Sequence, residues 1–355
     1  KSALNGFLEQ SHAVWDPEKQ KMMEFKDLIE DPKTKETWTT SMANELGRLA
    51  QGVRDMKGSN CMKFTHQNQV PEGRKATHAR LAVDHRPGKS DPNRTRLTVG
   101  GNSLSFEGDL CTETTDLTSI KMSLNSVLST KGAKFMTVDM KNFCLGTPMD
   151  VHECVKIKYD LMPQEIKNEC DSQEKVTNDG HAHVEIKKGM CGSKQAGALA
   201  NDQLEKLLKQ DGHVKTKFTP GSWKHKTRPV MFNSCVDDFG VQHAGREHAE
   251  HLIATLKKHC EDATVDWEGE KFCGMNLEWD HNKRTCDVSV QGHAMEQLKK
   301  LQHKMRRTQH APSKFTPPKY GQKVQMAKEE SEATSTPTEM KRSQKVIGAF
   351  PWHGR

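Results

Sequence analysis

The sequence predicts a mixed α/β fold of the α+β class, in which helices and short strands alternate along 355 residues. Two observations carry this prediction. Apolar residues recur at helical spacing in four segments, and short apolar runs bounded by turn residues lie between those segments. Interleaved strands and helices favour a mixed sheet over an all-α or all-β architecture. A chain of this length suits two or three lobes around a common cleft.

Four amphipathic helices are expected. The first has one apolar face made of Trp38, Met42, Leu46, Leu49 and Val53. The other three are expected over about residues 195–210, 246–260 and 294–305, and Gly212 is placed to end the second helix. Residues 308–345 are rich in Pro, Ser, Thr and Lys, and we interpret them as a linker.

Short strands are expected at residues 135–138, 230–236 and 272–279. The first strand ends at Asp139, and the second reaches a tight turn at Asp237 and Asp238. Residues 71–96, rich in Arg, Pro and Asp, are expected to form a loop or hairpin with little buried surface. The sequence therefore predicts three aspartates at the ends of two strands.

The net charge of +7 indicates a polyanionic partner, with nucleic acid favoured over acidic lipid and an ordinary basic protein as the simpler alternative. No run of about 18 apolar residues is present, so no membrane span is expected. Ten cysteines without a C-x-x-C pair argue against a zinc ribbon and are typical of a reducing compartment. A thiol- or His-based metal protein is therefore disfavoured.

The three aspartates have the chemistry that two-metal phosphoryl transfer needs. Carboxylates from separate strands can converge on two ions about 3.5–4 Å apart, and hard oxygen ligands suit Mg²⁺ or Mn²⁺. Adjacent aspartates at a turn are more often structural, because Asp favours turns. Taken alone, Asp237 and Asp238 are therefore a weak signal, which the position of Asp139 strengthens.

Two further segments are candidates for nucleotide contacts. Arg94 and Arg96 precede a Gly turn, where their guanidinium groups can clamp a triphosphate, although a solvated hairpin is the simpler interpretation. Residues 189–197 (GMCGSKQAG) form a glycine-punctuated turn that opens a helix. Small residues there would let a nucleotide or a template base approach the backbone closely.

The order of these segments resembles the reverse transcriptase domain of copia-type LTR retrotransposon polyproteins. The matching segments are 38–46 (WTTSMANEL, resembling W-x-x-A-M-x-x-E-L), 94–97 (RTRL, K-A-R-L), 138–143 (VDMKNF, D-V-K-x-A-F), 189–195 (GMCGSKQ, G-x-Y-G-L-x-Q), 235–238 (CVDD, Y-V-D-D), 272–277 (FCGMNL, Y-L-G-I-x-I) and 345–348 (KVIG, Q-x-x-V-G-x-L). Residues 139–149 (DMKNFCLGTPM) are similar to variants that read D-x-K-N-F-x-L-G-T-P-M. The resemblance spans residues 36–350.

This resemblance implies a right-hand polymerase with fingers, palm and thumb, and with the mixed sheet in the palm. The implied divisions are an N-terminal extension (1–37), fingers (38–114 and 151–194), palm (115–150 and 195–282), thumb (283–307) and a connection toward RNase H (308–355). The implied activity is RNA-directed DNA polymerisation on a primed RNA or DNA template. Template–primer and dNTPs would be its partners, with no membrane. Copying would take place in cytoplasmic virus-like particles, with the nucleus as the alternative, and integrase and RNase H segments would belong to the same polyprotein.

The resemblance also implies roles for individual residues. Asp139, Asp237 and Asp238 would hold Mg²⁺ or Mn²⁺ and act as the catalytic residues. The nucleotide-binding residues would be Arg94 and Arg96 at the triphosphate, Cys144 beneath the sugar and Gln195 in the nucleotide pocket. The nucleic-acid-binding residues would be Gly274 at the primer and Lys299, Lys300, Lys304, Arg306 and Arg307 along the duplex backbone. A solvated helix face is the alternative interpretation of the five basic residues.

Several positions depart from the family pattern. Cys235, Cys144 and Cys191 stand where the family has aromatic residues, and Ser193 stands where it has Leu. A smaller side chain at position 144 should weaken the exclusion of ribonucleotides. Loss of a buried ring typically costs about 3–5 kcal/mol of stability. The alternative function is therefore a catalytically impaired remnant that only binds nucleic acid.

Overall fold

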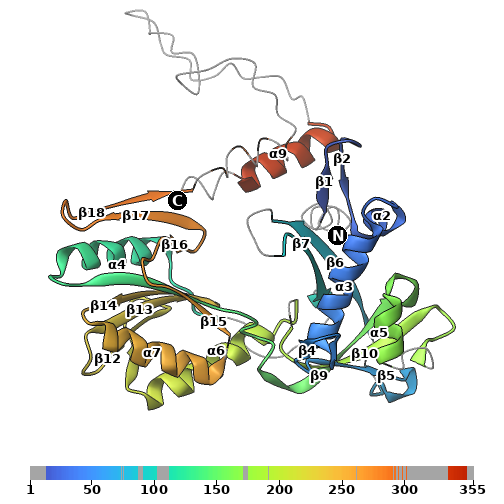
Figure 1. Ribbon diagram of the computed structural model, residues 1–355, viewed down its shortest axis with the longest axis horizontal. Coiled ribbons are helices and arrows are strands. Elements are labelled where there is room, and N and C mark those ends of the chain that lie inside the picture. Colours follow the sequence, from blue (N-terminus) through green and yellow to red (C-terminus); the bar gives the residue numbers. More distant parts are fainter. Residues whose placement is uncertain are drawn as a thin grey trace, which may run out of the picture. The chain divides into compact units, whose positions relative to one another are not determined.

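The structure is a computed structural model of the α+β class, in which helices accompany several separate sheets (Figure 1). It describes residues 13–72, 74, 76–86, 91–101, 112–170, 175–190, 192–260, 262–290, 292, 295, 298, 301 and 335–349. The chain divides into two compact units, Lys1–Cys273 and Gly274–Arg355. No helix within the described residues has both the length and the apolar character needed to cross a bilayer.

One half of unit 1 is built on a five-stranded sheet, whose strands come from separate parts of the sequence. Its strands, in spatial order, are β5 (Met62–Thr65), β10 (His181–Lys188), β9 (Pro148–Lys158), β6 (Thr77–His85) and β7 (Asn93–Val99). Neighbouring strands are antiparallel except β6 and β9, which are parallel. The parallel pair is possible because a long connection separates β6 from β9 in sequence.

Helix α3 (Lys35–Leu49) covers the free edge of β7. The Ser41 hydroxyl accepts a hydrogen bond from Thr95 N at 2.8 Å, and the Glu45 carboxylate accepts one from Leu97 N at 3.1 Å. Polar side chains of the helix therefore satisfy edge amides that would otherwise be open to another strand. Trp38, on the apolar face of the same helix, is buried in the core.

A six-stranded sheet forms the second half of unit 1. Its strands, in spatial order, are β11 (His213–Lys215), β12 (Ser222–His225), β13 (Val230–Cys235), β14 (Asp238–His243), β8 (Lys134–Met140) and β15 (Ala263–Asp266). All neighbours are antiparallel, so the mixed sheet expected in the palm range is wrong. Short connections join β12, β13 and β14, and short connections permit only antiparallel pairing. The mixed pairing occurs in the five-stranded sheet instead.

Helices cover both faces of the six-stranded sheet (Figure 1). Helix α4 (Leu117–Ser129) lies on one face, and α6 (Ala196–Gln210) and α7 (Arg246–His259) lie on the other. The Asp116 carboxylate starts α4 by accepting a hydrogen bond from Ser119 N at 2.8 Å. Buried apolar side chains from α6, α7 and the sheet form one core, which is separate from the core around α3.

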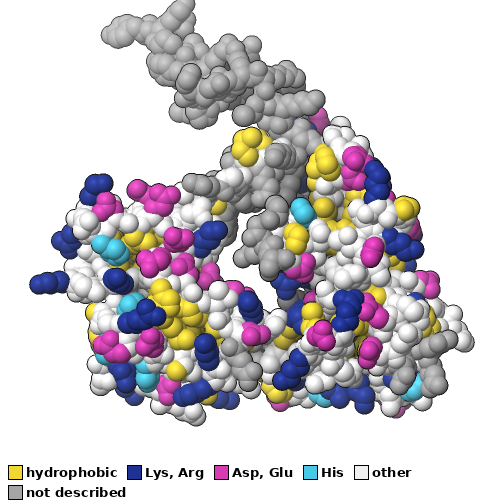
Figure 2. All heavy atoms as spheres, viewed as in Figure 1, with side chains coloured by type: hydrophobic (Ala, Val, Ile, Leu, Met, Phe, Trp, Pro, Cys, Tyr) yellow, Lys and Arg dark blue, Asp and Glu magenta, His cyan; other side chains and the backbone are white. Residues whose placement is uncertain are grey.

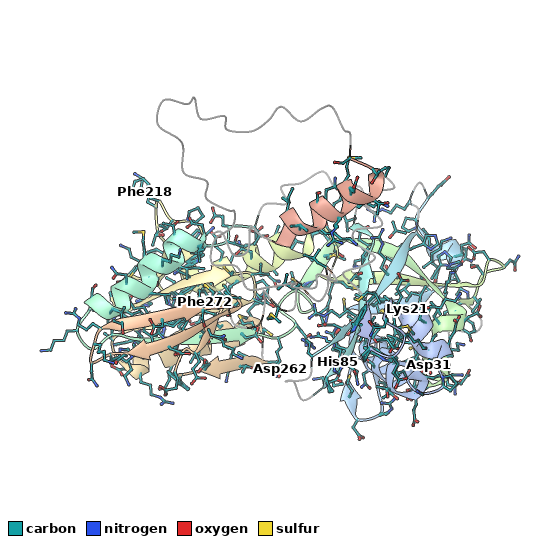
Figure 3. All side chains as sticks on the ribbon, turned by 90° about the horizontal axis from the view of Figure 1, so that it is seen from above. Lys21, Asp31, His85, Phe218, Asp262 and Phe272 are labelled. Carbon is teal, nitrogen blue, oxygen red and sulfur yellow. The ribbon has the colours of Figure 1, made fainter. Side chains whose placement is uncertain are left out.

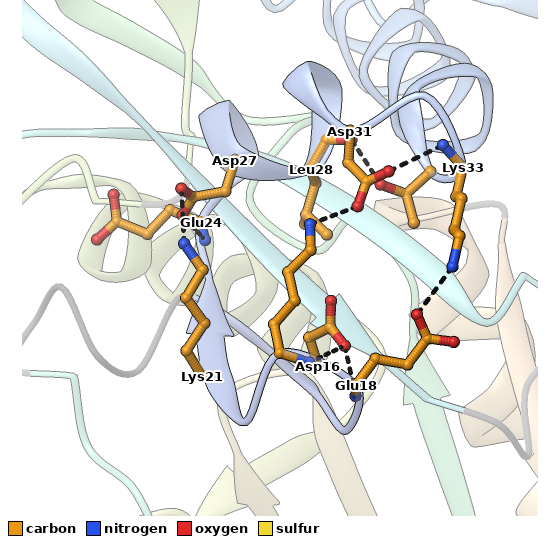
Figure 4. A network of polar contacts seen from close by, with 10 residues as sticks. Asp16, Glu18, Lys21, Glu24, Asp27, Leu28, Asp31 and Lys33 are labelled. Atoms are coloured by element: carbon orange, nitrogen blue, oxygen red, sulfur yellow. Dashed lines mark hydrogen bonds and ion pairs between the residues drawn. The ribbon is translucent and has the colours of Figure 1, made fainter.

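The remaining elements of unit 1 are short. They are β1 (Val14–Asp16), β2 (Lys21–Met23), α2 (Phe25–Glu30), β3 (Gly52–Val53), β4 (Met56–Lys57), the 3₁₀ turns η2 (Gln67–Gln69) and η4 (Tyr159–Leu161), α5 (Gln164–Glu169) and β16 (Lys271–Phe272). The β1–β2 hairpin and α2 carry a network of Lys–Asp and Lys–Glu pairs (Figure 4). In unit 2, β17 (Met275–Asp280) pairs with β18 (Thr285–Ser289), and α9 spans Pro337–Ala349.

Most expected elements are present, with three corrections. Helix α3 ends at Leu49, because Gly52 adopts φ +120° and turns the chain, although Val53 is still buried. The strand expected at 272–279 is interrupted by a turn at Cys273 and Gly274, which both have positive φ. Part of the expected linker is helical, since α9 begins at Pro337. Most of the helix expected at 294–305 lies outside the described residues.

Candidate functional site

The hairpin of β13 and β14 carries Asp237 and Asp238. Cys235 and Asp238 are paired across it, so only Val236 and Asp237 form the turn. Val236 adopts φ +60°, a conformation that β-branched residues rarely take and that the first position of such a turn normally gives to Gly. Strain of this kind, on the order of 1–3 kcal/mol, is most common at functional sites.

Asp139 lies beside this hairpin because β8 pairs with β14. The Cα atoms of Asp139 and Asp238 are direct cross-strand partners, and Met140 N donates a hydrogen bond to Asp237 O at 2.8 Å. Side chains of directly opposite residues share one face of a sheet, with Cβ atoms about 4.5–5.5 Å apart. Asp139 therefore meets the adjacent pair Asp237 and Asp238, which is distant from it in sequence, at one end of the six-stranded sheet.

The three carboxylates form a cluster of negative charge. Partial burial, and then the charges of Asp139 and Asp237, raise the pKa of Asp238 to about 6, although a hydrogen bond from Cys273 N acts in the opposite direction. The pKa of Asp237 is also raised, by desolvation and then by Asp139, against the opposing effect of Arg96. Across the described ranges, no Lys or Arg forms an ion pair with any of the three.

The donor set fits a hard divalent cation in charge and in chemistry. Mg²⁺ and Mn²⁺ prefer carboxylate oxygens, and a cation would relieve the repulsion that raises the pKa of Asp238. In the part of the chain that is described, however, no three His, Cys, Asp or Glu side chains already stand close enough to share one ion. Side-chain rotation at the hairpin would be needed to close such a site.

Cys273 contacts Asp238, and the sequence did not predict this contact. Its backbone N–H donates a hydrogen bond to Asp238 Oδ2 at 2.7 Å. The preceding residue, Phe272, is buried and packs edge-on against Phe135 of β8 with ring centroids 5.9 Å apart. The turn after β16 therefore positions the Asp238 carboxylate. No sequence signal indicates which carboxylate receives a backbone N–H from a distant turn.

Arg94 and Arg96 project from one face of β7, two residues apart. Arg94 is half-buried, and burial together with the neighbouring Arg96 lowers its pKa, while Glu45 acts in the opposite direction. Arg96 is exposed and close enough to Asp237 to stabilise its ionised form. The exposed guanidinium of Arg96 therefore lies near the acidic cluster. This is the position expected of an arginine that binds an anion beside the aspartates.

Three backbone segments meet at the glycine turn after β10. A Cβ on Gly192 would lie 2.2 Å from Val99 O, and one on Gly101 would lie 2.3 Å from Gly192 O. A Cβ on Gly189 would lie 2.6 Å from Cys144 O. Only glycine permits these approaches, which bring the end of β7 and the segment of Cys144 to the same turn.

The other predicted site residues are placed as follows. Gln195 is buried, and its side-chain amide donates hydrogen bonds to Val151 O at 3.1 Å and to Met149 Sδ at 3.4 Å. As placed, it holds the start of β9, so its contact with a nucleotide stays a prediction. Gly274 lies in unit 2 with φ +77°. The predicted nucleic-acid-binding residues Lys299, Lys300, Lys304, Arg306 and Arg307 lie outside the described residues.

The surface shows no single basic area on the face drawn in Figure 2. There, Lys and Arg side chains are interspersed with Asp and Glu among the described residues. Comparison with known proteins adds no identity: neither a protein-family model nor a curated protein significantly matches the sequence.

Proposed function

We propose that the chain is an RNA-directed DNA polymerase, similar to the reverse transcriptases of copia-type retrotransposons. The observation that carries the proposal is the cross-strand pairing of Asp139 with Asp238, with Asp237 in the adjoining turn. Carboxylates that converge from two neighbouring strands are the arrangement that two-metal nucleotidyl transfer requires. The division that this function implies is fingers (38–114 and 151–194), palm (115–150 and 195–282) and thumb (283–307).

The residues of the chain would share the work as follows. Asp139, Asp237 and Asp238 would hold two divalent ions, which when bound activate the primer hydroxyl and balance charge on the leaving pyrophosphate. Arg94 and Arg96 would bind the triphosphate, since guanidinium groups match phosphate oxygens in geometry and charge. Cys144 would lie beneath the sugar, where its small side chain would discriminate weakly against a 2′-hydroxyl.

The test is nucleotide incorporation on poly(rA)/oligo(dT) with dTTP and Mg²⁺. We expect Asp237→Asn/Asp238→Asn to reduce incorporation on the order of 10³-fold or more, because catalytic groups that act as a unit fail together. The matched control is Asp27→Asn/Asp31→Asn, which removes the same charge from the network in Figure 4. Equal incorporation by wild type and the hairpin variant would refute the enzymatic proposal.

The second candidate is a remnant that binds nucleic acid without turnover. It is favoured by Cys144 and Cys235, which stand where the family that the sequence resembles has aromatic residues. Fluorescence anisotropy with a labelled RNA–DNA duplex separates the two candidates. A remnant binds equally well in EDTA and in Mg²⁺, loses affinity steeply with salt and incorporates no nucleotide.

A further inference from the structure

Two cysteines that the proposed chemistry does not use lie beside the acidic cluster. Cys235 is the last residue of β13, and Cys273 directly follows β16. Cys235 is the cross-strand partner of Asp238, and Cys273 N donates a hydrogen bond to an oxygen of the Asp238 carboxylate. Interaction between the two thiols lowers the pKa of Cys235 and raises that of Cys273, as expected where the two side chains lie side by side. Both side chains are half-buried and both thiols are free. The fold therefore joins two thiols that are far apart in sequence.

Rigid neighbours hold the pair in place. Phe272 is buried against Phe135, which fixes the chain directly before Cys273. The Cys273 backbone N–H donates to Asp238 Oδ2 at 2.7 Å, and Cys235 is the cross-strand partner of Asp238. Asp238 is thus bonded to the backbone of one cysteine and paired with the strand of the other, so a backbone movement at either cysteine acts on this carboxylate.

We propose that Cys235 and Cys273 are a modification site that a hydroperoxide oxidises to a reversible disulfide, and that this disulfide weakens divalent-cation binding at Asp238. Formation of the disulfide is independent of the proposed polymerase function. Control of nucleotide incorporation by the disulfide rests on that function.

The reaction balances with hydrogen peroxide as the oxidant. One sulfur attacks a peroxide oxygen, so an S–O bond forms, the O–O bond breaks, and the first thiol proton leaves in a water molecule. The second sulfur then attacks the sulfenic sulfur, so the S–S bond forms and the hydroxyl leaves as water with the second thiol proton. Two thiols and one peroxide give one disulfide and two waters, and two electrons pass from sulfur to oxygen.

The geometry explains the effect on Asp238. A disulfide requires its two Cβ atoms to lie about 3.5–4.5 Å apart, so the bond would fix the position of the turn at Cys273 relative to β13. Asp238 accepts its hydrogen bond from the backbone of that same residue. Displacing a group that orients a metal ligand typically costs about 10–100-fold in metal affinity or activity.

The first experiment measures the bond itself. The full chain, reduced and then treated with one equivalent of hydrogen peroxide, should lose the mass of two hydrogen atoms, and unreduced peptide mapping should link Cys235 to Cys273. Cys273→Ser should abolish this link, and the matched control Cys286→Ser, which changes another half-buried cysteine, should retain it. Peroxide treatment that gives no link, or a link between other cysteines, overturns the proposal.

The second experiment measures the effect on the acidic cluster without relying on catalysis. Titration of Mg²⁺ against Tm should give an apparent affinity that falls about tenfold or more on oxidation and recovers with dithiothreitol. Cys273→Ser should show no effect of peroxide on this titration. A disulfide that forms while the Mg²⁺ response is unchanged, or a reduced chain with no Mg²⁺ response, overturns the coupling. If the chain forms the disulfide and responds to Mg²⁺ but incorporates no nucleotide, only the proposed polymerase function is overturned.

Discussion

Two acidic regions of unit 1 contain the same residue type in opposite electrostatic states. In the N-terminal region, Asp31 pairs with Lys19 and Asp27 pairs with Lys21 (Figure 4). The hydrogen bond from Lys19 lowers the pKa of Asp31, and the hydrogen bond from Glu24 N, followed by that of Lys21, lowers the pKa of Asp27. Asp27 and Asp31 therefore each have a lysine partner.

At the β13–β14 hairpin the carboxylates have each other as neighbours instead. Burial and mutual repulsion raise the pKa of Asp238 to about 6 and raise that of Asp237 as well. The two regions differ in whether the aspartates have lysine partners, and not in how many aspartates they contain. This difference distinguishes a structural acidic region from a candidate catalytic one. Carboxylates that repel one another and have no ion-pair partner among the described residues lower stability, which is the pattern expected where function requires an external ion.

The largest expected effect concerns the apolar support of the hairpin. Phe272→Ala should lower the free energy of unfolding by about 3–5 kcal/mol, because it empties a fully buried ring site between Phe135 and Gly240. The control is Phe218→Ala, which removes a ring that is 84% exposed and projects outward in Figure 3. Urea denaturation measures both variants. Equal losses would mean that Phe272 does not support the turn that binds Asp238.

The next prediction concerns the stability cost of burying an ionisable side chain at a site away from the three aspartates. His213 is fully buried, and burial, with His225 and His251 adding to it, lowers its pKa to about 4 against the opposing charge of Asp211. The unfolded chain, with a pKa near the usual 6.5, then binds more protons than the folded chain between about pH 6.5 and 4. Stability should fall by about 3 kcal/mol as the pH drops through that window.

The measurement is the free energy of unfolding as a function of pH for wild type and His213→Leu. The variant should lack this part of the acid sensitivity, so the difference between the two curves isolates His213. His281→Leu removes an exposed imidazole and serves as the control. Parallel curves for wild type and His213→Leu would contradict the prediction.

A smaller effect of opposite sign is expected at Asp238. Its folded pKa lies above its unfolded value, so stability falls as the pH rises from about 3.8 to about 6, and the full cost of ionisation is present above that range. Asp238→Asn keeps an oxygen for the hydrogen bond from Cys273 N and should raise the free energy of unfolding by about 2 kcal/mol at pH 7.5 in EDTA. Mg²⁺ should reduce this gain by stabilising wild type alone. A variant less stable than wild type in EDTA would show that the cluster is not repulsive.

The spacing of apolar residues predicted where the helices form better than it predicted where α3 ends. Helices α6 and α7 lie within one residue of the expected ranges, because their apolar stripes and Gly212, with φ +87°, act locally. The apolar stripe of α3 correctly predicted that Val53 is buried, but Val53 lies in β3 and not in the helix. Apolar spacing reports burial, and a residue just past a turn can still reach the same core.

The candidate site was predictable in its residues but not in its contacts. The sequence indicated Asp139, Asp237 and Asp238, but the pairing of Asp139 with Asp238 depends on which distant strands become neighbours. The backbone donor at Cys273 and the buried amide of Gln195 depend on packing between segments in the same way. Contacts of this kind are set by tertiary structure, which single-sequence patterns do not encode.

The smallest effect is expected in the N-terminal region, where it completes the comparison. Asp27→Asn keeps an acceptor for Glu24 N but loses the charge that pairs with Lys21 at 3.4 Å. Because the pKa of Asp27 is lowered on folding, its stabilisation is present at neutral pH and is lost as the pH falls below about 3.8. Both side chains are more than a third exposed, so the loss at pH 7 should be about 0.5 kcal/mol or less and should vanish in 0.5 M salt. Thermal unfolding at low and high salt measures it. The same Asp→Asn change should therefore destabilise here and stabilise at Asp238, and two changes of the same sign would remove the distinction between the two regions.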